Sequence, residues 1–256
     1  MYSSLFVAAM AFTYFFGGAL FGFYLQQRLP AHHLDKESRK TAELAAALIS
    51  TMAALILGLM VASSKSSFDE VNAKISDAGA KAILLDRTLC YYGADARQAR
   101  EKLRDALTLI LERIWPKSQS PVYMSTESDV QKGKKLEDVG NLVRAFKTEN
   151  EEQHELKSTA LRLCEGLEQT RWEMIESKNP PLPVPILGIT FFWLTALLTL
   201  FCLFAPRTPT MLMVIFICAI SISGAIYLFL ELGNPQNGLI RISPTPIEKA
   251  LREIGQ

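Results

Sequence analysis

The charged residues of this 256-residue chain are segregated along the sequence. Of its 27 basic and 26 acidic side chains, 39 lie between Lys65 and Lys178. Residues 1–27, 44–64, 179–206 and 208–230 contain no charge, and each stretch matches or exceeds the roughly 20 apolar residues that a helix needs to cross a bilayer. The pattern predicts an all-α, four-span membrane protein. Its mean hydropathy of +0.16 averages two chemically different parts.

We expect the following order of regions. Residues 1–64 hold transmembrane spans at about 5–25 and 44–64, and residues 181–232 hold spans at about 184–205 and 211–230. Residues 65–180, which lie between them, predict a helical stalk, and residues 233–256 predict a loop followed by an amphipathic helix. The first stretch has no basic residue before it and no small-residue cleavage site after it, which indicates a retained span rather than a signal peptide.

A single long helix is predicted from Lys36 to Tyr92, because no proline or strong breaker interrupts this stretch. Asp35 is a candidate N-cap and Gly93 a candidate stop. At 1.5 Å per residue the helix would be roughly 85 Å long, so we expect it to leave the membrane as part of the stalk. After the second span, apolar residues recur at alternating spacings of three and four, which is typical of a coiled-coil seam: Phe68, Val71, Ile75, Ala78, Ala82, Leu85 and Leu89.

Two more stalk helices are expected, over about 95–115 and 136–178, with a turn-rich loop over 117–135 between them. The second of these helices also carries a three-four apolar repeat, which is weakest at Glu149 and Gln153. Polar residues there predict a solvated or register-fixing point within one helix. The two repeats suggest self-association, although helices of one chain could also satisfy each other.

The C-terminal tail carries a helix-start signal. Thr245 with Glu248 three residues later predicts a capping box, and Pro246 suits the first helical position. We expect a short amphipathic helix that docks on the stalk or at the membrane surface.

Several classes of function are disfavoured. The polar region holds 19 basic and 20 acidic residues, so its field would not collect nucleic acid. The four cysteines lack a C-x-x-C spacing and the three histidines form no ligand cluster, so we expect no metal site, no disulfide framework and no cofactor. No nucleophile, base and orienting group can be assembled, so we expect no enzymatic activity.

The second span carries small residues at every fourth position. One interpretation is a pore-lining face, with Leu55 or Leu59 as a constriction and with Thr51 and Lys65 supplying a hydroxyl and a cationic rim. The other interpretation is close helix packing in lipid, as also expected for Gly18 and Gly22 in the first span. The pore-lining candidates are Ser50, Thr51, Ala54, Leu55, Gly58, Leu59, Ala62 and Lys65.

Two titratable features adjoin the spans. Glu231 could hold ions or protons, pair with Arg241, or mark the point where the fourth span leaves the bilayer, and we favour the last interpretation. His32 and His33 could sense pH, but adjacent histidines more simply belong to a solvated loop.

Four segments of the chain form a recognisable set: LPAHHLDKES, ALISTMAALILGLMVASSKSSFD, LGITFFWLTALLTLFCLFAPR and ELGNPQNGLIRIS. Together they resemble the bestrophin-like family of bacterial membrane proteins. The family-motif positions carried by the first and last segments are His33, Glu37, Glu231, Pro235, Gly238, Arg241 and Ser243.

The resemblance implies a function. Bestrophins proper are homopentameric channels, chiefly for anions, with four membrane segments and a helical cytosolic region between the second and third. By resemblance we expect a homo-oligomer, a pentamer by analogy, in a bacterial inner membrane. The chain departs from bestrophins at the pore neck, because no aromatic residue lies between Leu44 and Ser67.

Two arguments place the stalk on opposite sides of the membrane. The connections after the first and third spans hold five Lys or Arg residues, which the positive-inside rule would place in the cytoplasm. The resemblance, together with two unpaired thiols in the polar region, favours a cytoplasmic stalk. We adopt the cytoplasmic stalk as our expectation.

Two hypotheses about function follow. The first is a homo-oligomeric ion channel, passing anions, whose second span lines the pathway. The second is a membrane-anchored scaffold or signalling subunit that binds a partner through its stalk. A transporter ranks third, because the spans hold no charged residue that could couple to ions.

Overall fold

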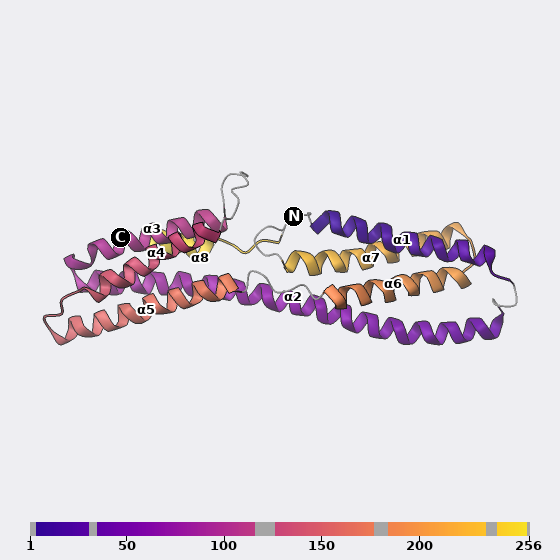
Figure 1. The fold of residues 1–256 in the computed structure, drawn as a ribbon, viewed down its shortest axis with the longest axis horizontal. Coiled ribbons are helices and arrows are strands. Elements are labelled where there is room, and N and C mark those ends of the chain that lie inside the picture. The colour runs from indigo at the N-terminus through magenta and orange to yellow at the C-terminus, as the bar shows by residue number, and fades with distance from the viewer. Residues whose placement is uncertain (1–3, 31–34, 116–125, 177–183, 234–239, 255–256) are drawn as a thin grey trace. The chain divides into compact units, whose positions relative to one another are not determined.

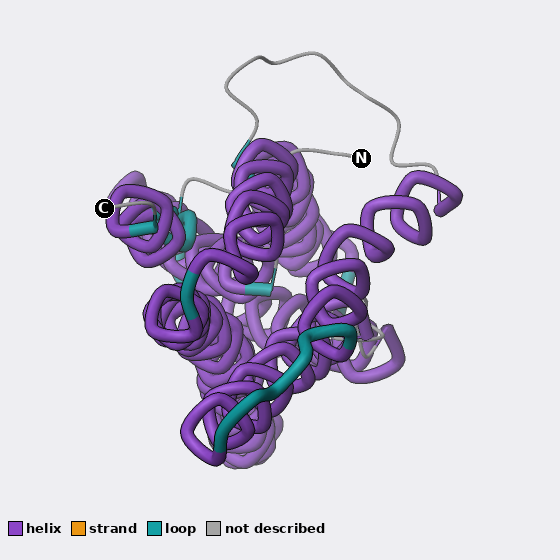
Figure 2. The backbone as a smooth tube through the Cα atoms, turned by 90° about the vertical axis from the view of Figure 1, so that its left-hand side faces the viewer, coloured by secondary structure: helices purple, strands orange, loops and turns teal. Residues whose placement is uncertain are grey.

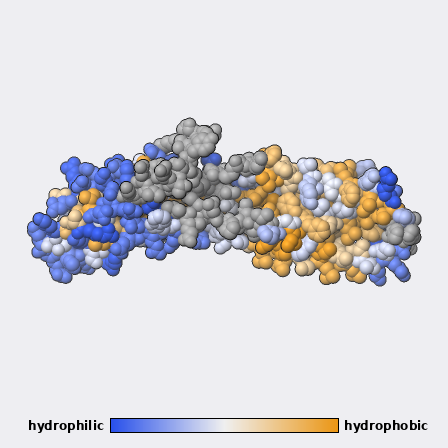
Figure 3. Space-filling view, viewed as in Figure 1, coloured by the Kyte–Doolittle hydropathy of each residue, from blue (hydrophilic) through white to orange (hydrophobic). Residues whose placement is uncertain are grey.

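The computed structural model describes residues 4–30, 35–115, 126–176, 184–233 and 240–254, and all regular structure in these ranges is helical (Figures 1 and 2). The chain divides into two compact units. We call Met1–Phe68 with Pro181–Ile240 the membrane unit, and Asp69–Pro180 with Arg241–Gln256 the polar unit. Hydrophobic surface gathers over the membrane unit and hydrophilic surface over the polar unit (Figure 3).

Four helices of the described ranges are long and apolar enough to cross a membrane, as predicted. They are α1 (Ser4–Arg28), the N-terminal part of α2 (Lys36–Tyr92), α6 (Val184–Phe204) and α7 (Pro209–Leu232). Each keeps many large apolar side chains exposed, because lipid rather than water is the solvent around them. The protein is a multi-pass membrane protein.

The membrane unit is held together by close helix contacts. In α1, Gly18 and Gly22 face α6 so closely that an added Cβ would collide with Thr195 or with the backbone oxygen of Thr199. The Thr199 hydroxyl donates to the Gly18 carbonyl oxygen at 2.9 Å. The predicted role of this glycine pair is therefore confirmed, with α6 of the same chain as its partner.

At one end of the membrane unit, Arg207 ties the turn between α6 and α7 to the end of α1. Its guanidinium donates to Gln26 Oε1 at 2.9 Å and to the Phe23 carbonyl oxygen. Gln26 in turn donates to the Ala205 carbonyl oxygen. On the far side of the turn, the Thr208 hydroxyl caps α7 by accepting from the Met211 amide.

The long α2 helix matches its predicted ends at Lys36 and Tyr92. The Asp35 carboxylate accepts from the Ser38 amide at 2.8 Å, which confirms the predicted N-cap. At the other end, Gly93 has a φ of 111°, a backbone conformation that side-chain-bearing residues rarely adopt. This glycine lets the chain turn directly into a 3₁₀ turn (Ala94–Ala96) and α3 (Arg97–Ile114).

The polar unit packs helices α3, α4 (Thr126–Arg144), α5 (Glu151–Glu176) and α8 (Thr245–Glu253) with the C-terminal part of α2 around one core. The predicted three-four repeat of α2 contributes Ala82, Leu85 and Leu89 to this core. The repeat is thus buried by helices of its own chain.

The predicted helix over 136–178 is wrong in two respects. The chain breaks after Arg144 and starts α5 at Glu151, and α4 begins ten residues earlier than expected, within the segment predicted as a loop. Residues 117–125 of that segment lie outside the described ranges. The break occurs at the weak point of the repeat, where the Asn150 side chain accepts from the Gln153 amide and the Gln153 side chain accepts from the Glu149 amide.

The tail helix α8 docks on the polar unit, which is the first of the two predicted locations. Ile247, Ala250 and Ile254 are buried, and Pro246 contacts α2 at Gly79, where an added Cβ would lie 2.8 Å from the Pro246 carbonyl oxygen. The predicted capping box is wrong, because Pro244 occupies the N-cap position and the helix starts one residue earlier. The Ser243 and Thr245 hydroxyls bond each other at 2.5 Å instead.

Candidate functional site

The candidate site is the outward side of α2 within the membrane unit. The opposite side of this helix packs on the unit's own core through Ala46, Ala53, Met60 and Ser64, which recur at spacings of seven, seven and four. Met60 lies against the buried hydroxyl of Thr190 in α6, with a sulfur-to-oxygen distance of 4.0 Å. One side of α2 is therefore fixed by intramolecular packing.

The predicted pore-lining residues lie mainly on the other side. Thr51, Ala54, Gly58, Ala62 and Lys65 are exposed, as are Leu55 (64%) and Leu59 (61%), and Ser50 is half-buried. An added Cβ at Gly58 would meet nothing within 4 Å. The fold of the single chain thus leaves this face available to lipid, to a pathway or to another copy.

The row of small residues at every fourth position of the second span does not stay on one face of α2. Four residues turn an α-helix by slightly more than one full turn, so such a row drifts around the helix. Ala46 at the start of the row is buried and Ser50 is half-buried, whereas the later members are exposed: Ala54, Gly58, Ala62 and Ser66. The face is better described by its exposure than by that spacing.

The polar groups of the face are few. The Thr51 and Ser50 hydroxyls donate back to the Ala47 carbonyl oxygen, at 2.8 and 3.2 Å, and each keeps lone pairs that can accept hydrogen bonds from other groups. The Lys65 ammonium lies 5.5 Å from the centre of the Phe68 ring, within range of a cation–π interaction. Such a face offers small dipoles and a cationic end rather than a fixed binding cage.

Glu231 lies where the fourth span ends, but it does not face solvent. Only 2% of it is exposed, its Oε1 accepts from the Ile240 amide at 3.3 Å, and it also bonds the Tyr227 hydroxyl one turn earlier. Ser64 of α2 is buried close by, with its Oγ 4.0 Å from the position of a Cβ on Gly233. The carboxylate therefore holds the returning chain against the end of α7.

The remaining family-motif positions belong to different segments of the chain. Glu37 is exposed near the start of α2, and Arg241 and Ser243 belong to the polar unit. His33, Pro235 and Gly238 lie outside the described residues.

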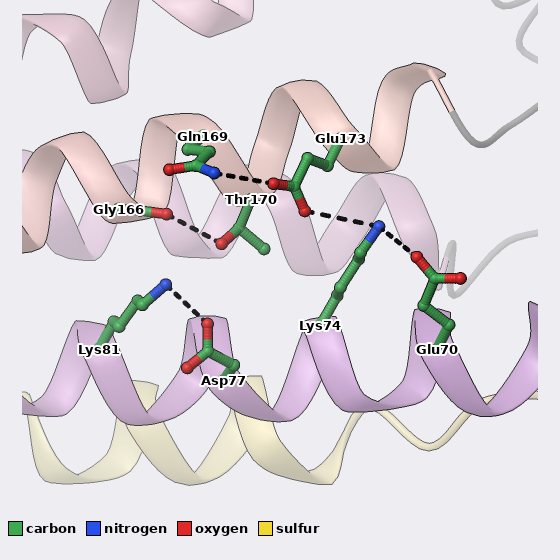
Figure 4. A network of polar contacts seen from close by, with 8 residues as sticks. All are labelled: Glu70, Lys74, Asp77, Lys81, Gly166, Gln169, Thr170 and Glu173. Carbon is green, nitrogen blue, oxygen red and sulfur yellow. Dashed lines mark hydrogen bonds and ion pairs between the residues drawn. The ribbon is translucent and has the colours of Figure 1, made fainter.

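In the polar unit, the ion pair of Lys74 with Glu173 joins α2 to α5, next to two ion pairs within α2 (Figure 4). Lys74 Nζ lies 2.8 Å from Glu70 and 3.4 Å from Glu173, and Lys81 lies 2.7 Å from Asp77. The hydrogen bond with Glu70 and the neighbouring charges raise the pKa of Lys74 above its usual range. In the middle of α5, burial raises the pKa of the Cys164 thiol to about 12, so this thiol stays protonated and unreactive.

Sequence reasoning missed the buried ion pair of this unit. Asp86 in α2 accepts two hydrogen bonds from Arg100 in α3, at 2.7 and 2.9 Å. The 14-residue separation crosses a turn, so no local spacing rule identifies the pair. The described residues also contain no group of three His, Cys, Asp or Glu side chains that could hold a metal ion.

These features define a four-span helical membrane protein whose second span continues into a polar helical unit. The Bestrophin-like domain matches residues 13–247, and the chain belongs to the Bestrophin-like family. Among solved structures, the crystal structure of a membrane protein is similar over 93% of this chain and 99% of that chain, with 14% sequence identity and a TM-score of 0.60. That similarity concerns the fold alone. A comparison with curated proteins found no match.

Proposed function

We propose that the protein is a homo-oligomeric ion channel, conducting anions, in which α2 lines the pathway. One observation carries the proposal: intramolecular packing covers one side of α2, and the side with Thr51, Leu55 and Ala62 is left open. Several such helices around an axis would form a narrow pathway lined by small and apolar side chains. Leucines at a constriction can gate by excluding water.

The rest of the proposal follows from the family. Membership supports an oligomer, with a pentamer by analogy with bestrophins proper, and a location in the bacterial inner membrane with the polar unit in the cytoplasm. Anion preference is supported by the absence of acidic side chains on the open face from Leu44 to Ser64 and by Lys65 at its end. We expect neither a cofactor nor an enzymatic reaction.

The test is electrical. Purified oligomers reconstituted in planar bilayers should pass current with a reversal potential set by the chloride gradient. Leu55→Ser should raise the current because it hydrates the constriction, whereas Leu228→Ser, at an exposed position of α7, should not. Folded oligomers that stay silent across voltage, pH and calcium would remove support for the channel.

The second candidate is a scaffold that binds a soluble partner through the polar unit. It is favoured by large apolar side chains exposed on that unit, including Tyr91 (79%), Leu84 and Trp172. This function predicts an axis plugged by apolar side chains and a stoichiometric partner that is lost on Tyr91→Ser. The channel predicts current from the Tyr91→Ser protein at its normal level.

A further inference from the structure

The outward side of α1 has a gap in its surface at Gly17. Exposed residues recur on this side at alternating spacings of three and four, which keeps them on one side of the helix: Phe6, Met10, Tyr14, Gly17, Phe21, Tyr24 and Arg28. Gly17 is the one small residue in this row, and nothing lies within 4 Å of a Cβ placed on it. The large side chains on either side of Gly17 therefore leave a notch that the described residues do not fill.

Aromatic rings form both walls of the notch. On one side, the centre of the Tyr14 ring lies 5.8 Å from that of the Phe15 ring and 6.0 Å from that of the Phe191 ring in α6. On the other side, the Phe21 and Tyr24 rings are stacked, with their centres 6.3 Å apart. Because ring contacts of this kind are attractive, they hold the walls in place and keep the notch open.

The row ends at a cation that has no carboxylate partner among the described residues. The Arg28 guanidinium lies 5.5 Å from the centre of the Tyr24 ring, within range of a cation–π interaction. Its planar fork of donors can bind a phosphate through two parallel hydrogen bonds. Eleven residues separate Gly17 from Arg28, which is about 16 Å along the helix and close to the depth of one leaflet of a bilayer.

We infer that this side of α1 binds one anionic phospholipid, with an acyl chain in the notch at Gly17 and the phosphate on Arg28. The occupant is a lipid rather than a helix, because a helix packs closely along a row of small residues, and here a single glycine lies between bulky rings. The headgroup is anionic because a zwitterionic one brings its own cation close to Arg28. The inference concerns lipid recognition and goes beyond the proposed channel.

Native mass spectrometry of the purified full-length protein can measure this binding, with dioleoyl phosphatidylglycerol and dioleoyl phosphatidylcholine as probes of equal chain length. We expect phosphatidylglycerol to bind about tenfold more tightly, and Arg28→Gln to remove that preference because the charge-assisted hydrogen bonds to the phosphate are lost. Lys40→Gln is the matched control. It removes another exposed cation of the membrane unit, near the start of α2, and should keep the preference.

Filling the notch tests the position of the acyl chain separately. Gly17→Leu should weaken the binding of both probes about tenfold and keep the preference between them, since the chain loses its van der Waals contacts in the notch. Gly224→Leu places the same side chain at an exposed glycine of α7, where nothing lies within 4 Å of an added Cβ either. This control should leave both affinities unchanged.

Equal affinities of the unaltered protein for the two lipids would overturn the inference. So would a loss of preference in Lys40→Gln as large as that in Arg28→Gln, because it indicates attraction by net charge alone. Equal effects of the two leucine substitutions would show that the acyl chain does not lie in the notch at Gly17. The channel proposal has its own electrical test and stands or falls separately from these results.

Discussion

Glycines in this chain have opposite surroundings according to the side of the helix that they occupy. Gly22 lies against the Thr199 carbonyl oxygen of α6, where even a methyl group collides with backbone. Gly17, on the exposed side of α1, has open space around it. In a membrane, where helix association depends on close contact, the first kind of glycine supports the fold and the second does not.

We therefore predict opposite effects of two equal substitutions. Gly22→Ala should destabilise the membrane unit by about 1–3 kcal/mol, because the collision forces α1 and α6 apart. Gly17→Ala should be neutral or stabilising by up to about 1 kcal/mol, because alanine is the better helix former. Unfolding of the two variants in detergent measures the difference, and equal stabilities would contradict the α1–α6 contact.

Glu168 on α5 should make the polar unit sensitive to pH. Burial, with Glu137 nearby, raises the pKa of its carboxyl above the usual 4.5. A raised carboxyl pKa contributes stability that is complete below the unfolded-state pKa and is lost as pH rises through the folded-state value. Glu168→Gln should therefore raise the melting temperature near neutral pH and leave it unchanged near about pH 4. Glu155→Gln, exposed on the same helix, is the control and should change neither.

At the scale of elements, the span helices and the full length of α2 could be predicted because charge segregation and the lack of breakers are local signals. The break between α4 and α5 could not, because the apolar spacing continues in phase from Phe146 to Leu156 with no proline or glycine between them. The turn depends on short caps at Asn150 and Gln153 and on packing against α2 and α3.

Only part of the candidate site could be predicted from the sequence. The residue types on α2 are visible in the sequence, but the side that faces outward depends on contacts with α6, more than a hundred residues away. The pairing of Thr190 with Met60 is an example. Sequence spacing alone therefore placed Ala46 and Ala54 in one row, although the first is buried and the second is exposed.

The contact between α2 and α3 should depend on the buried pair of Asp86 and Arg100. Asp86→Asn leaves a guanidinium with weaker acceptors in a partly buried position, so we expect a loss of about 1–3 kcal/mol. Glu101→Gln removes an exposed pair with Arg97 and should cost less than about 0.5 kcal/mol. Denaturant unfolding followed by the helical signal of the purified protein compares the two. Equal losses would show that the pair does not hold the helices together.

At the scale of the whole molecule, the segregation of charge divides the chain into two units that are stabilised by different interactions. The membrane unit depends on close apolar contact in lipid, and the polar unit depends on a core surrounded by ion pairs. Since α2 belongs to both units, residues before and after its span must lie on opposite sides of the membrane. One labelling experiment therefore fixes the orientation of the entire chain.

We expect the polar unit to be cytoplasmic. Cys90 is an exposed thiol on that unit, and Gln27 is exposed near the end of α1, across the membrane from it. In spheroplasts, an impermeant maleimide should spare Cys90 until the membrane is opened, and it should label Gln27→Cys at once in a Cys90→Ser background. Cys218, exposed on α7 toward lipid, is replaced by serine in both proteins. The reverse labelling pattern would place the polar unit outside the cytoplasm. The positive-inside rule favours that orientation, because the connections after the first and third spans hold five basic residues. A cytoplasmic partner of the polar unit would then be excluded.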